Sequence, residues 1–231
     1  MTVTQQERLF VLTGAGVSAE SGLATFRGSG GLWNGYRVDQ VATPEAWDAD
    51  PELVWRFYSM RRRDALAAQP NAAHLALAKA EQKLGENFYL CTQNVDDLHE
   101  RAGSHRIHHM HGSLFQSRCV DCELPFEDGK CYDKELPTCP DCGAAVRPHI
   151  VWFGEIPLQM DTIYRELERA TRLLVVGTSG SVYPAAGLVH IARQRGIRTV
   201  YSGPEDPLNA DAFDEIVLGP ATEVLPPLLA K

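Results

Sequence analysis

The chain has 231 residues, of which 44% are hydrophobic, and it carries a formal net charge of −8. This length predicts one large domain, or a domain with a small insert, and the acidic balance argues against a nucleic-acid-binding protein that relies on a broad basic surface. We find no run of about 18 apolar residues and no apolar segment in the polar stretch 1–8, so neither a transmembrane helix nor a signal peptide is expected.

Short apolar runs alternate along the chain with segments of helical spacing. Each run ends in glycine or in a polar turn, which is typical of strands buried on both faces of a parallel sheet. The predicted strands are 8–13, 88–92, 172–176, 197–201 and 215–218. The predicted helices are 18–23, 72–84, 158–171 and 185–194. This alternation predicts an α/β fold built on a Rossmann-like, doubly wound parallel sheet.

Two stretches interrupt the alternation of strand and helix. One is helical and rich in aromatic residues and arginine, and the other holds most of the cysteines together with many turn-forming residues. We therefore expect a nucleotide-binding domain with two inserted modules. The predicted ranges are 1–35, 72–115 and 149–231 for the nucleotide-binding domain, 36–71 for a helical module and 116–148 for a zinc-binding insert.

A glycine-rich turn, Gly14-Ala15-Gly16-Val17-Ser18-Ala19, follows the first predicted strand and opens a helix. It fits the G-x-G-x-x-G/A pattern, in which glycines let the backbone approach a pyrophosphate at a helix N-terminus. A tight turn without a ligand is the alternative. A dehydrogenase would carry an acidic residue about 20 positions further on, but that region contains Arg27 and a run of glycines. A hydride-transferring dehydrogenase is therefore disfavoured.

Four cysteines form two tight pairs, Cys119-x-x-Cys122 and Cys139-x-x-Cys142, separated by residues 123–138. This spacing predicts one tetrahedral zinc site, and four thiolates leave no open position for water, so the zinc is expected to be structural. Four unliganded thiols are the alternative. Cys91 lies in an apolar run and Cys131 has no CxxC partner. Cysteines paired for metal rather than for disulfides suit a reducing cytoplasm.

Four motifs together resemble the sirtuins, which are NAD-dependent protein lysine deacylases. The motifs are 14–28, Thr92-Gln93-Asn94-Val95-Asp96, His111-Gly112 before a CxxC pair, and Gly177-Thr178-Ser179. The resemblance covers nearly the whole chain, in the right order. The segment 147–155, and Thr25 where many sirtuins have aspartate, are similar to the bacterial class III branch. The resemblance implies a Rossmann-type large domain, a small zinc-ribbon domain, and a cleft between them for NAD and substrate.

The resemblance also implies which residues contact NAD, a co-substrate that the reaction consumes. Gly14, Ala15 and Gly16 would hold the pyrophosphate, and Gly177, Thr178 and Ser179 would contact the adenosine half. The remaining cofactor-binding residues implied are Ala19, Glu20, Thr25, Phe26, Arg27, Trp33, Gln93, Asn94, Asp96, Ser202, Gly203 and Ala221. The chain departs from its relatives at Ser202-Gly203-Pro204, where many carry Asn-Leu-Glu.

His111 is the predicted catalytic base, because its position beside the zinc insert matches the family and because a histidine pKa suits proton transfer near neutral pH. His105, His108, His109 and His190 are interpreted as core or surface residues. The implied reaction yields nicotinamide, acyl-ADP-ribose and free lysine.

Tyr58 and Arg61 are three residues apart in a predicted helix with Asp50 as its N-cap and Pro51 as its first residue, so they share a face. In isolation such an arginine indicates a solvated surface, but the pair matches the residues with which class III sirtuins recognise malonyl, succinyl and glutaryl lysine. The family also implies that a substrate peptide lies between two backbone segments, one of them formed by Val151, Trp152, Phe153 and Gly154 and the other by 180–183. The expected partners are acylated lysines in proteins or peptides, without a membrane or a sequence-specific nucleic acid.

Two other functions stay open. A mono-ADP-ribosyltransferase would use the same pocket but would leave ADP-ribose on a protein. A non-enzymatic module would use the zinc ribbon to bind nucleic acid or protein, and the charge of −8 and the cluster of His111, Asn94 and Asp96 argue against it.

Overall fold

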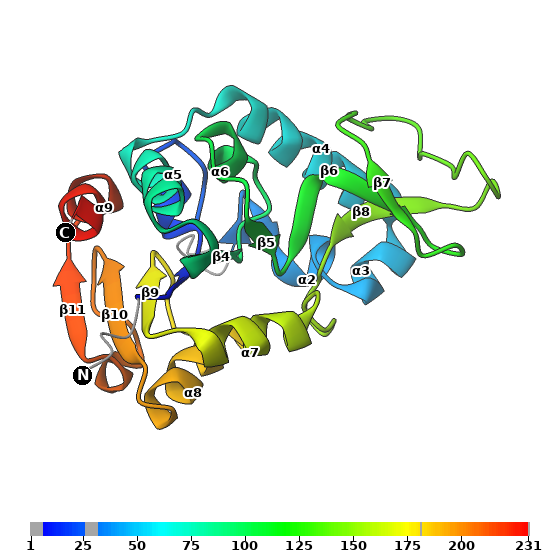
Figure 1. Ribbon diagram of the computed structural model, residues 1–231. Coiled ribbons are helices and arrows are strands. Elements are labelled where there is room, and N and C mark those ends of the chain that lie inside the picture. Colours follow the sequence, from blue (N-terminus) through cyan, green and yellow to red (C-terminus); the bar gives the residue numbers. More distant parts are fainter. Residues whose placement is uncertain (1–6, 26–31, 181, 231) are drawn as a thin grey trace, which may run out of the picture.

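A computed structural model describes residues 7–25, 32–180 and 182–230 of the chain. Its centre is a six-stranded sheet with the order β11-β10-β9-β1-β4-β5 (Figure 1). Every neighbouring pair in it is parallel. The strands are β1 (Leu9–Thr13), β4 (Phe88–Thr92), β5 (Ile107–His109), β9 (Arg172–Val176), β10 (Arg198–Gly203) and β11 (Glu215–Leu218). The predicted parallel sheet is confirmed.

Helices cover both faces of this sheet. One face packs against α5 (Ala72–Leu84) and α9 (Ala221–Ala230), and the other against α7 (Met160–Arg169) and α8 (Leu188–Gln194). The alternation of side chains along β1 divides the core accordingly. Leu9 and Val11 belong to the first cluster, whereas Phe10 and Leu12 belong to the second. All four are buried, which explains why the strand is apolar throughout. The doubly wound arrangement is confirmed.

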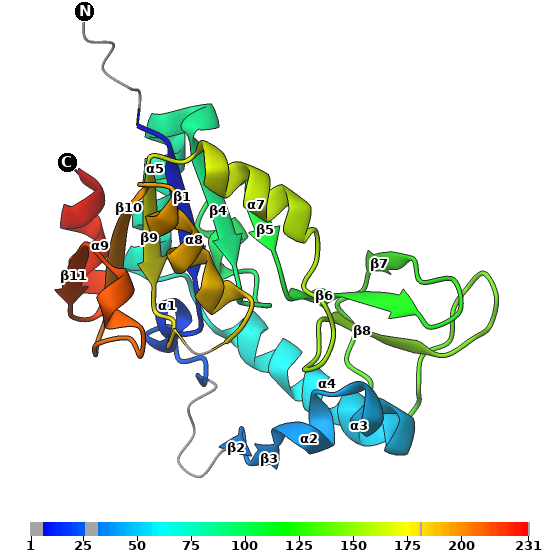
Figure 2. The ribbon, with the colours of Figure 1, turned by 90° about the horizontal axis from the view of Figure 1, so that it is seen from below.

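A long helix, α4 (Pro51–Ala67), runs from the large sheet to the smaller part of the molecule (Figure 2). Asp50 caps it by accepting a hydrogen bond of 2.8 Å from the Leu53 N–H, and Pro51 occupies its first turn, as predicted. It packs with α2 (Val38–Val41) and α3 (Pro44–Ala49), and a short hairpin of β2 (Leu32–Trp33) and β3 (Tyr36–Arg37) precedes them.

The smaller part is a three-stranded antiparallel sheet with the order β7-β6-β8. Its strands are β6 (Gly112–Cys119), β7 (Pro125–Glu127) and β8 (Val146–Ile150), so they extend on both sides of the predicted insert 116–148. Trp55 of α4 is fully buried against Cys119, Cys139 and Val146, and its indole N–H donates to the Val146 carbonyl at 2.8 Å. This contact fixes the sheet to α4.

Several elements differ from the predicted ones. Helix α1 covers Gly16–Ala19 rather than 18–23, and Gly22 with φ +90° lies where the predicted helix would continue. Strand β5 and helix α9 were not predicted. A 3-10 turn, η2 (Ala185–Gly187), precedes α8, and the remaining short elements are η1 (Gly85–Asn87), α6 (Leu98–Arg101) and η3 (Ala210–Ala212). Among the described residues, no helix is both long and apolar enough to cross a membrane.

Candidate active site

Most of the predicted site residues lie at the edge of the large sheet where its parallel strands end. The loop after β1 carries 14–16, the loop after β4 carries 93–96, the loop after β9 carries 177–179, and β10 ends at Gly203. Ligands of open α/β sheets bind outside the carboxyl ends of the strands. The fold therefore brings together the motifs that the sequence separates by up to about 190 positions.

The glycines of the first loop pack against the loop that follows β9. The Gly14 N–H donates to the Val176 carbonyl at 2.9 Å, and the Gly16 N–H donates to the Gly177 carbonyl at 2.8 Å. A Cβ atom on Gly16 would lie 2.7 Å from the Gly177 Cα, and Gly177 itself has φ +61°. These glycines thus allow the two backbones to touch, and the N–H groups of Gly14 and Gly16 are themselves engaged in that contact.

A buried polar network lies directly below this turn. Ser18 Oγ donates to Asp96 Oδ2 at 3.2 Å and accepts from Asn94 Nδ2 at 3.2 Å. The ring of His74 lies within 3.4 Å of the same hydroxyl and 4.9 Å from the ring of His99. All of these side chains are at least 90% buried. The network holds Asn94 and Asp96 in fixed orientations.

Burial raises the pKa of the Asp96 carboxyl, while hydrogen bonds from the Leu98 N–H and Ser18 and the charge of Arg61 oppose that rise. Burial lowers the pKa of Arg61, and the charge of Asp96 opposes this by favouring the charged guanidinium. Asp96, on the loop after β4, and Arg61, on α4, therefore shift each other's pKa.

His111 lies between β5 and β6, and its Nδ1 is 3.2 Å from the Gln93 carbonyl oxygen. Because a carbonyl can only accept, Nδ1 carries the proton in the neutral ring and Nε2 carries the lone pair. Burial lowers the pKa of His111, and the bond to Gln93 partly offsets this. Gly112 has φ +81°, and a Cβ there would lie 2.0 Å from the His149 carbonyl oxygen. The glycine after His111 therefore lets β6 meet β8.

Two buried polar atoms at this edge have no hydrogen-bond partner among the described residues, namely Gln93 Nε2 and Ser202 Oγ. Both residues were predicted to contact NAD, and an unpaired buried donor or hydroxyl is what a bound polar ligand would satisfy. Together with the turn of 14–16, they fit a dinucleotide.

The other residues predicted to contact NAD are placed as follows. Thr178 and Ser179 are half-buried beside Gly177, and Gly203 and Ala221 are buried near the ends of β10 and α9. Ala15 and Thr25 are half-buried, and Ala19 is exposed. Glu20 accepts hydrogen bonds from the N–H and hydroxyl of Thr222, so its carboxylate is engaged with α9. Trp33 lies in the hairpin of β2 and β3, against Phe57 of α4. Phe26 and Arg27 lie outside the described residues.

Tyr58 and Arg61 lie on α4, where Tyr58 contacts Trp152 and Arg61 contacts Trp33. Tyr58 is fully buried, and its hydroxyl accepts a hydrogen bond of 3.1 Å from the Trp152 indole N–H. The guanidinium carbon of Arg61 lies 4.1 Å from the centre of the Trp33 ring, and its Nη1 is buried without a hydrogen-bond partner in the described part of the chain. A buried guanidinium nitrogen without a partner is an available donor for an anion.

The three consecutive arginines of α4 have different environments. Arg61 stacks on Trp33, as described above, and Arg63 forms an exposed ion pair of 2.9 Å with Asp133. Arg62 is fully buried and donates to Ser117 Oγ at 3.1 Å and to Asp128 at 3.3 Å. It also bonds the Leu114 carbonyl. Only Arg61 of the three therefore has the character of a binding residue.

The predicted peptide-binding segment already uses some of its backbone. The Val151 N–H donates to the His111 carbonyl at 2.9 Å and the Phe153 N–H donates to the Ala42 carbonyl at 3.0 Å. The Trp152 N–H donates to the Glu155 carboxylate at 2.8 Å. Gly154 has φ +93° and open space where a side chain would be. A strand added here cannot pair with these three N–H groups, so it would depend on the carbonyls and on Gly154.

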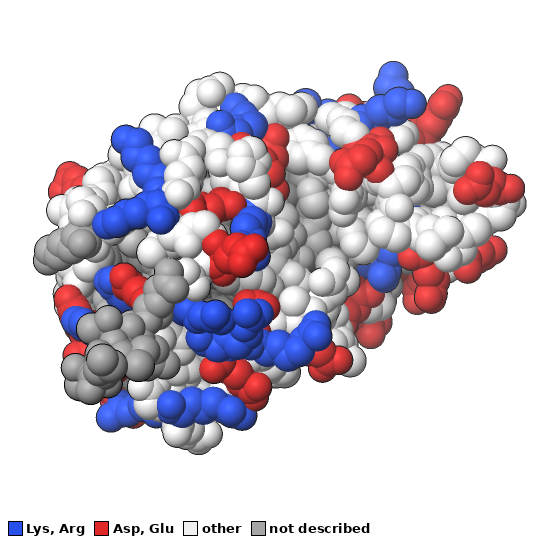
Figure 3. All heavy atoms as spheres, viewed as in Figure 1, with Lys and Arg blue, Asp and Glu red and all other residues white. Residues whose placement is uncertain are grey.

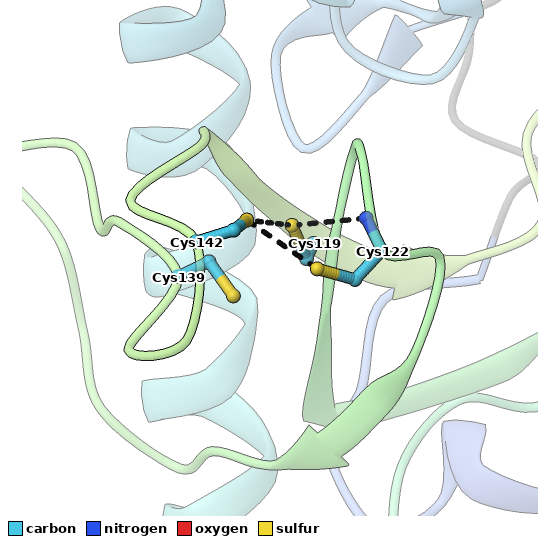
Figure 4. A group of neighbouring side chains, drawn as sticks. All are labelled: Cys119, Cys122, Cys139 and Cys142. Carbon is cyan, nitrogen blue, oxygen red and sulfur yellow. Dashed lines mark hydrogen bonds between the residues drawn. The ribbon is translucent and has the colours of Figure 1, made fainter.

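The four CxxC cysteines meet at the end of the smaller sheet, and their Sγ atoms point toward one another from two facing loops (Figure 4). All four Sγ atoms lie within 4.8 Å of each other. Zinc–sulfur bonds of about 2.3 Å place tetrahedral sulfurs about 3.8 Å apart, so the donor set fits one zinc ion. Cys131 lies outside the cluster, near the Ser59 carbonyl, and Cys91 is buried in the large core.

Sequence reasoning missed the residues that support the site. His109 bonds the Asn94 carbonyl at 2.9 Å and Glu100 at 2.6 Å, although it was interpreted as a core or surface residue. Ser18 and His74 were not singled out. In the sequence, Ser18 and His74 differ from other residues only as polar residues within apolar segments. Their role is recognised only from the contacts that they make in the fold.

On the face shown in Figure 3, lysine and arginine side chains are interspersed with aspartate and glutamate. The described residues of that face therefore form no continuous basic surface of the kind that nucleic-acid binding requires.

Comparison with known proteins identifies the family. The Sir2 family model matches residues 14–184. A protein of Caulobacter vibrioides named NAD-dependent protein deacylase is 53% identical over 224 residues, covering 95% of this chain and 94% of its own length. A protein of Escherichia coli strain K12 with the same name is 49% identical over 230 residues, covering 98% of this chain and 82% of its own.

Two solved structures agree. A Sir2 homologue in complex with NAD has a TM-score of 0.89 and 46% identity, covering 96% of this chain and 88% of that one. A Sir2 protein with a p53 peptide and NAD+ has a TM-score of 0.81 and 30% identity, covering 96% and 92%. The chain belongs to the Sir2 family.

Proposed function

We propose that this protein is an NAD-dependent protein lysine deacylase that prefers acyl groups ending in a carboxylate. The observation that carries the proposal is the position of Arg61. Its Nη1 is buried without a hydrogen-bond partner among the residues that the structure describes, and the side chain lies near Tyr58. The Sir2 relatives of this chain include proteins named NAD-dependent protein deacylase. A charged acyl end would supply the partner that this nitrogen lacks.

The roles of the catalytic residues follow from their contacts. His111 is held by the Gln93 carbonyl with Nε2 as its accepting atom, so it serves as the general base. Asn94 and Asp96, fixed through Ser18, position the sugar and a water molecule. NAD, when bound, supplies the sugar carbon that takes up the acyl oxygen and loses nicotinamide. The residues of 14–16 and 177–179 hold its phosphates and adenosine half.

The acyl chain would enter between α4 and the segment Val151–Gly154. An acetyl group has no carboxylate, so it would leave Arg61 unpaired and would bind more weakly than a succinyl group. Tyr58 adds a hydroxyl, and the surrounding aromatic rings supply apolar contact for the methylene groups. The same arrangement would accept malonyl and glutaryl lysine.

The substrate is an acylated lysine in a protein or peptide, which would lie along Val151–Gly154 through backbone contacts. Zinc is bound by Cys119, Cys122, Cys139 and Cys142, one ion per chain, and it stabilises the smaller sheet rather than taking part in the reaction. None of the six cysteines among the described residues forms a disulfide, which supports a reducing compartment such as the cytoplasm.

The test is a panel of acetyl-, malonyl-, succinyl- and glutaryl-lysine peptides incubated with NAD. Nicotinamide release is measured first, and mass spectrometry then identifies the products. We expect free lysine and acyl-ADP-ribose, with higher kcat/KM for the charged acyl groups. ADP-ribose attached to the peptide or to a protein would instead identify a mono-ADP-ribosyltransferase, and no nicotinamide release from any peptide would show that the protein is not an enzyme of this type.

A further inference from the structure

A hydrogen bond connects the predicted peptide-binding segment with the predicted acyl-binding helix. The Trp152 indole N–H lies 3.1 Å from the Tyr58 hydroxyl oxygen, and the two side chains are 2% and 0% exposed. An indole N–H can only donate, so the direction of this bond is known. Tyr58 accepts from Trp152.

Two further contacts hold Trp152, one at its ring and one at its backbone. The Arg147 guanidinium carbon lies 3.3 Å from the centre of the ring, a cation–π contact. The Glu155 carboxylate accepts from the Trp152 backbone N–H at 2.8 Å, and it also pairs with Arg147 at 2.8 Å and Arg118 at 3.2 Å. Arg118 and Arg147 lie on β6 and β8, so the smaller sheet fixes the ring.

This arrangement determines what the Tyr58 hydroxyl can do. Burial raises its pKa to about 12, so it keeps its proton at neutral pH. Because the hydroxyl oxygen accepts from the Trp152 N–H, its own O–H is directed away from Trp152. Within the described ranges no acceptor for this O–H is found, and the charge of the neighbouring Arg61 acts on Tyr58. The hydroxyl is thus an unused donor beside an unused guanidinium nitrogen.

We propose that Trp152 is a positioning residue for acyl selectivity, which acts by orienting the Tyr58 O–H toward the acyl carboxylate. This inference rests on the proposed function, because it requires the carboxylate that Arg61 and Tyr58 would share. Without the indole N–H, the Tyr58 hydroxyl could rotate and its buried oxygen would lose its donor, so its hydrogen bond to the acyl group would be weakened.

The test compares Trp152→Phe with wild type for succinyl- and acetyl-lysine peptides. Phenylalanine keeps an aromatic ring for Arg147 and removes the N–H. We expect succinyl kcat/KM to fall about fivefold more than acetyl kcat/KM, the scale of one hydrogen bond, and mainly through KM. Trp47→Phe is the matched control, since Trp47 lies 6.0 Å from Trp152 ring to ring but is not bonded to Tyr58. It should leave the ratio of the two substrates unchanged.

A double-mutant comparison tests whether Trp152 acts through Tyr58. In a Tyr58→Phe background, Trp152→Phe should change the succinyl-to-acetyl ratio no further. If Trp152→Phe does not fold, 3-benzothienylalanine at position 152, which replaces the N–H by sulfur and keeps the ring shape, gives the same comparison.

Three outcomes would contradict the inference. Equal losses on both substrates would make Trp152 a purely structural residue. A further change of the ratio in the Tyr58→Phe background would show that Trp152 does not act through Tyr58. A wild-type protein that frees no lysine from any acyl peptide would remove the proposed function itself, and with it this role, whereas the first two outcomes leave the deacylase function intact.

Discussion

The guanidinium of Arg61 lies 4.1 Å above the ring of Trp33, and its Nη1 is buried without a hydrogen-bond partner in the described residues. The neighbouring Arg62 has several protein partners. A cation kept in an apolar setting costs stability unless a ligand uses it. Because the two adjacent arginines differ in this way, a substitution of Arg62 can serve as the control for a substitution of Arg61.

Replacing Arg61 by methionine should lower succinyl-lysine kcat/KM by roughly 10- to 100-fold, the scale of a lost charge-assisted hydrogen bond. Acetyl-lysine turnover should change little, because an acetyl group offers the guanidinium nothing to bind. Steady-state kinetics with both peptides checks this. Equal losses on the two substrates in a folded protein would make Arg61 structural and would refute the preference for charged acyl groups.

Arg62→Met is the matched control for Arg61→Met. It removes the buried cation that pairs with Asp128 and the side-chain donor to the Leu114 carbonyl. It should therefore lower the free energy of unfolding by about 3–5 kcal/mol, the usual cost of breaking a buried ion pair, and with it the urea midpoint. Any activity loss should affect succinyl and acetyl peptides equally. A selective loss of succinyl turnover in Arg62→Met would show that the acyl site lies elsewhere on α4.

The pH dependence of kcat/KM should report His111. Burial lowers the pKa of this histidine from its ordinary value near 6.5, and a general base must be neutral to accept a proton. Activity should therefore be constant at pH 7–8 and should fall as pH drops through an apparent pKa below about 6.5.

Two variants test whether His111 is the group that causes this pH dependence. His111→Tyr should fold and bind zinc but lose most activity, because a phenol is a poor base near neutral pH. His190→Gln changes an exposed histidine of α8 and should keep both the activity and the profile. Activity of His111→Tyr within about threefold of wild type would exclude the assigned role.

Zinc binding is tested by changing one cysteine inside the cluster and one outside it. Cys139→Ser removes one of four thiolates that lie within 4.8 Å of each other, so it should lose the metal and lower the melting temperature, since zinc binding contributes to folding of the smaller sheet. Cys131→Ser should keep one zinc per chain. Metal analysis that finds no zinc in wild type, or unchanged zinc in Cys139→Ser, contradicts the assignment.

Burial lowers the pKa of His74 to about 4, so the folded protein keeps this side chain neutral in mild acid. The unfolded chain binds a proton there near pH 6.5. The unfolded state therefore gains protons that the folded state does not, and stability from this group is complete above pH 6.5 and decreases toward pH 4, by up to about 3 kcal/mol. Buried His99, whose pKa is also lowered by burial, adds to the same trend.

Urea unfolding at pH 7 and pH 5 measures this effect. Wild type should lose about 2 kcal/mol more than His74→Gln between these pH values, because glutamine has no proton to bind. The exposed His190→Gln should behave like wild type. A stability change that is the same in His74→Gln and wild type would mean that His74 is already accessible to protons in the folded protein.

The sequence was sufficient to predict the parallel sheet and most of the helices that cover it. The apolar runs that became β1, β4, β9, β10 and β11 are short and bounded by turns, and helix 72–84 matches α5 in both bounds. Strand β5 was missed because Ile107-His108-His109 holds two polar residues, and helix α9 because Pro226 and Pro227 lie inside it. Its apolar face against α5 compensates for these prolines.

The site was predictable where a motif places residues next to a strand end, as with Gln93, Asn94 and His111. Contacts between distant segments were not predictable. The Trp152–Tyr58 bond joins positions 94 residues apart. No local pattern indicates that Arg62 has several partners whereas Arg61 Nη1 has none in the described part of the chain. Both depend on how the smaller sheet packs on α4.

The most direct test of the whole account is a stoichiometry. Purified protein is incubated with a succinyl-lysine peptide and NAD, and the amounts of nicotinamide released and of lysine freed are measured over the same time. We predict one nicotinamide for each lysine freed, and no lysine freed when NAD is omitted. Lysine freed without NAD, or nicotinamide released in excess of lysine freed at every time point, would contradict the assignment of this protein as an NAD-dependent deacylase.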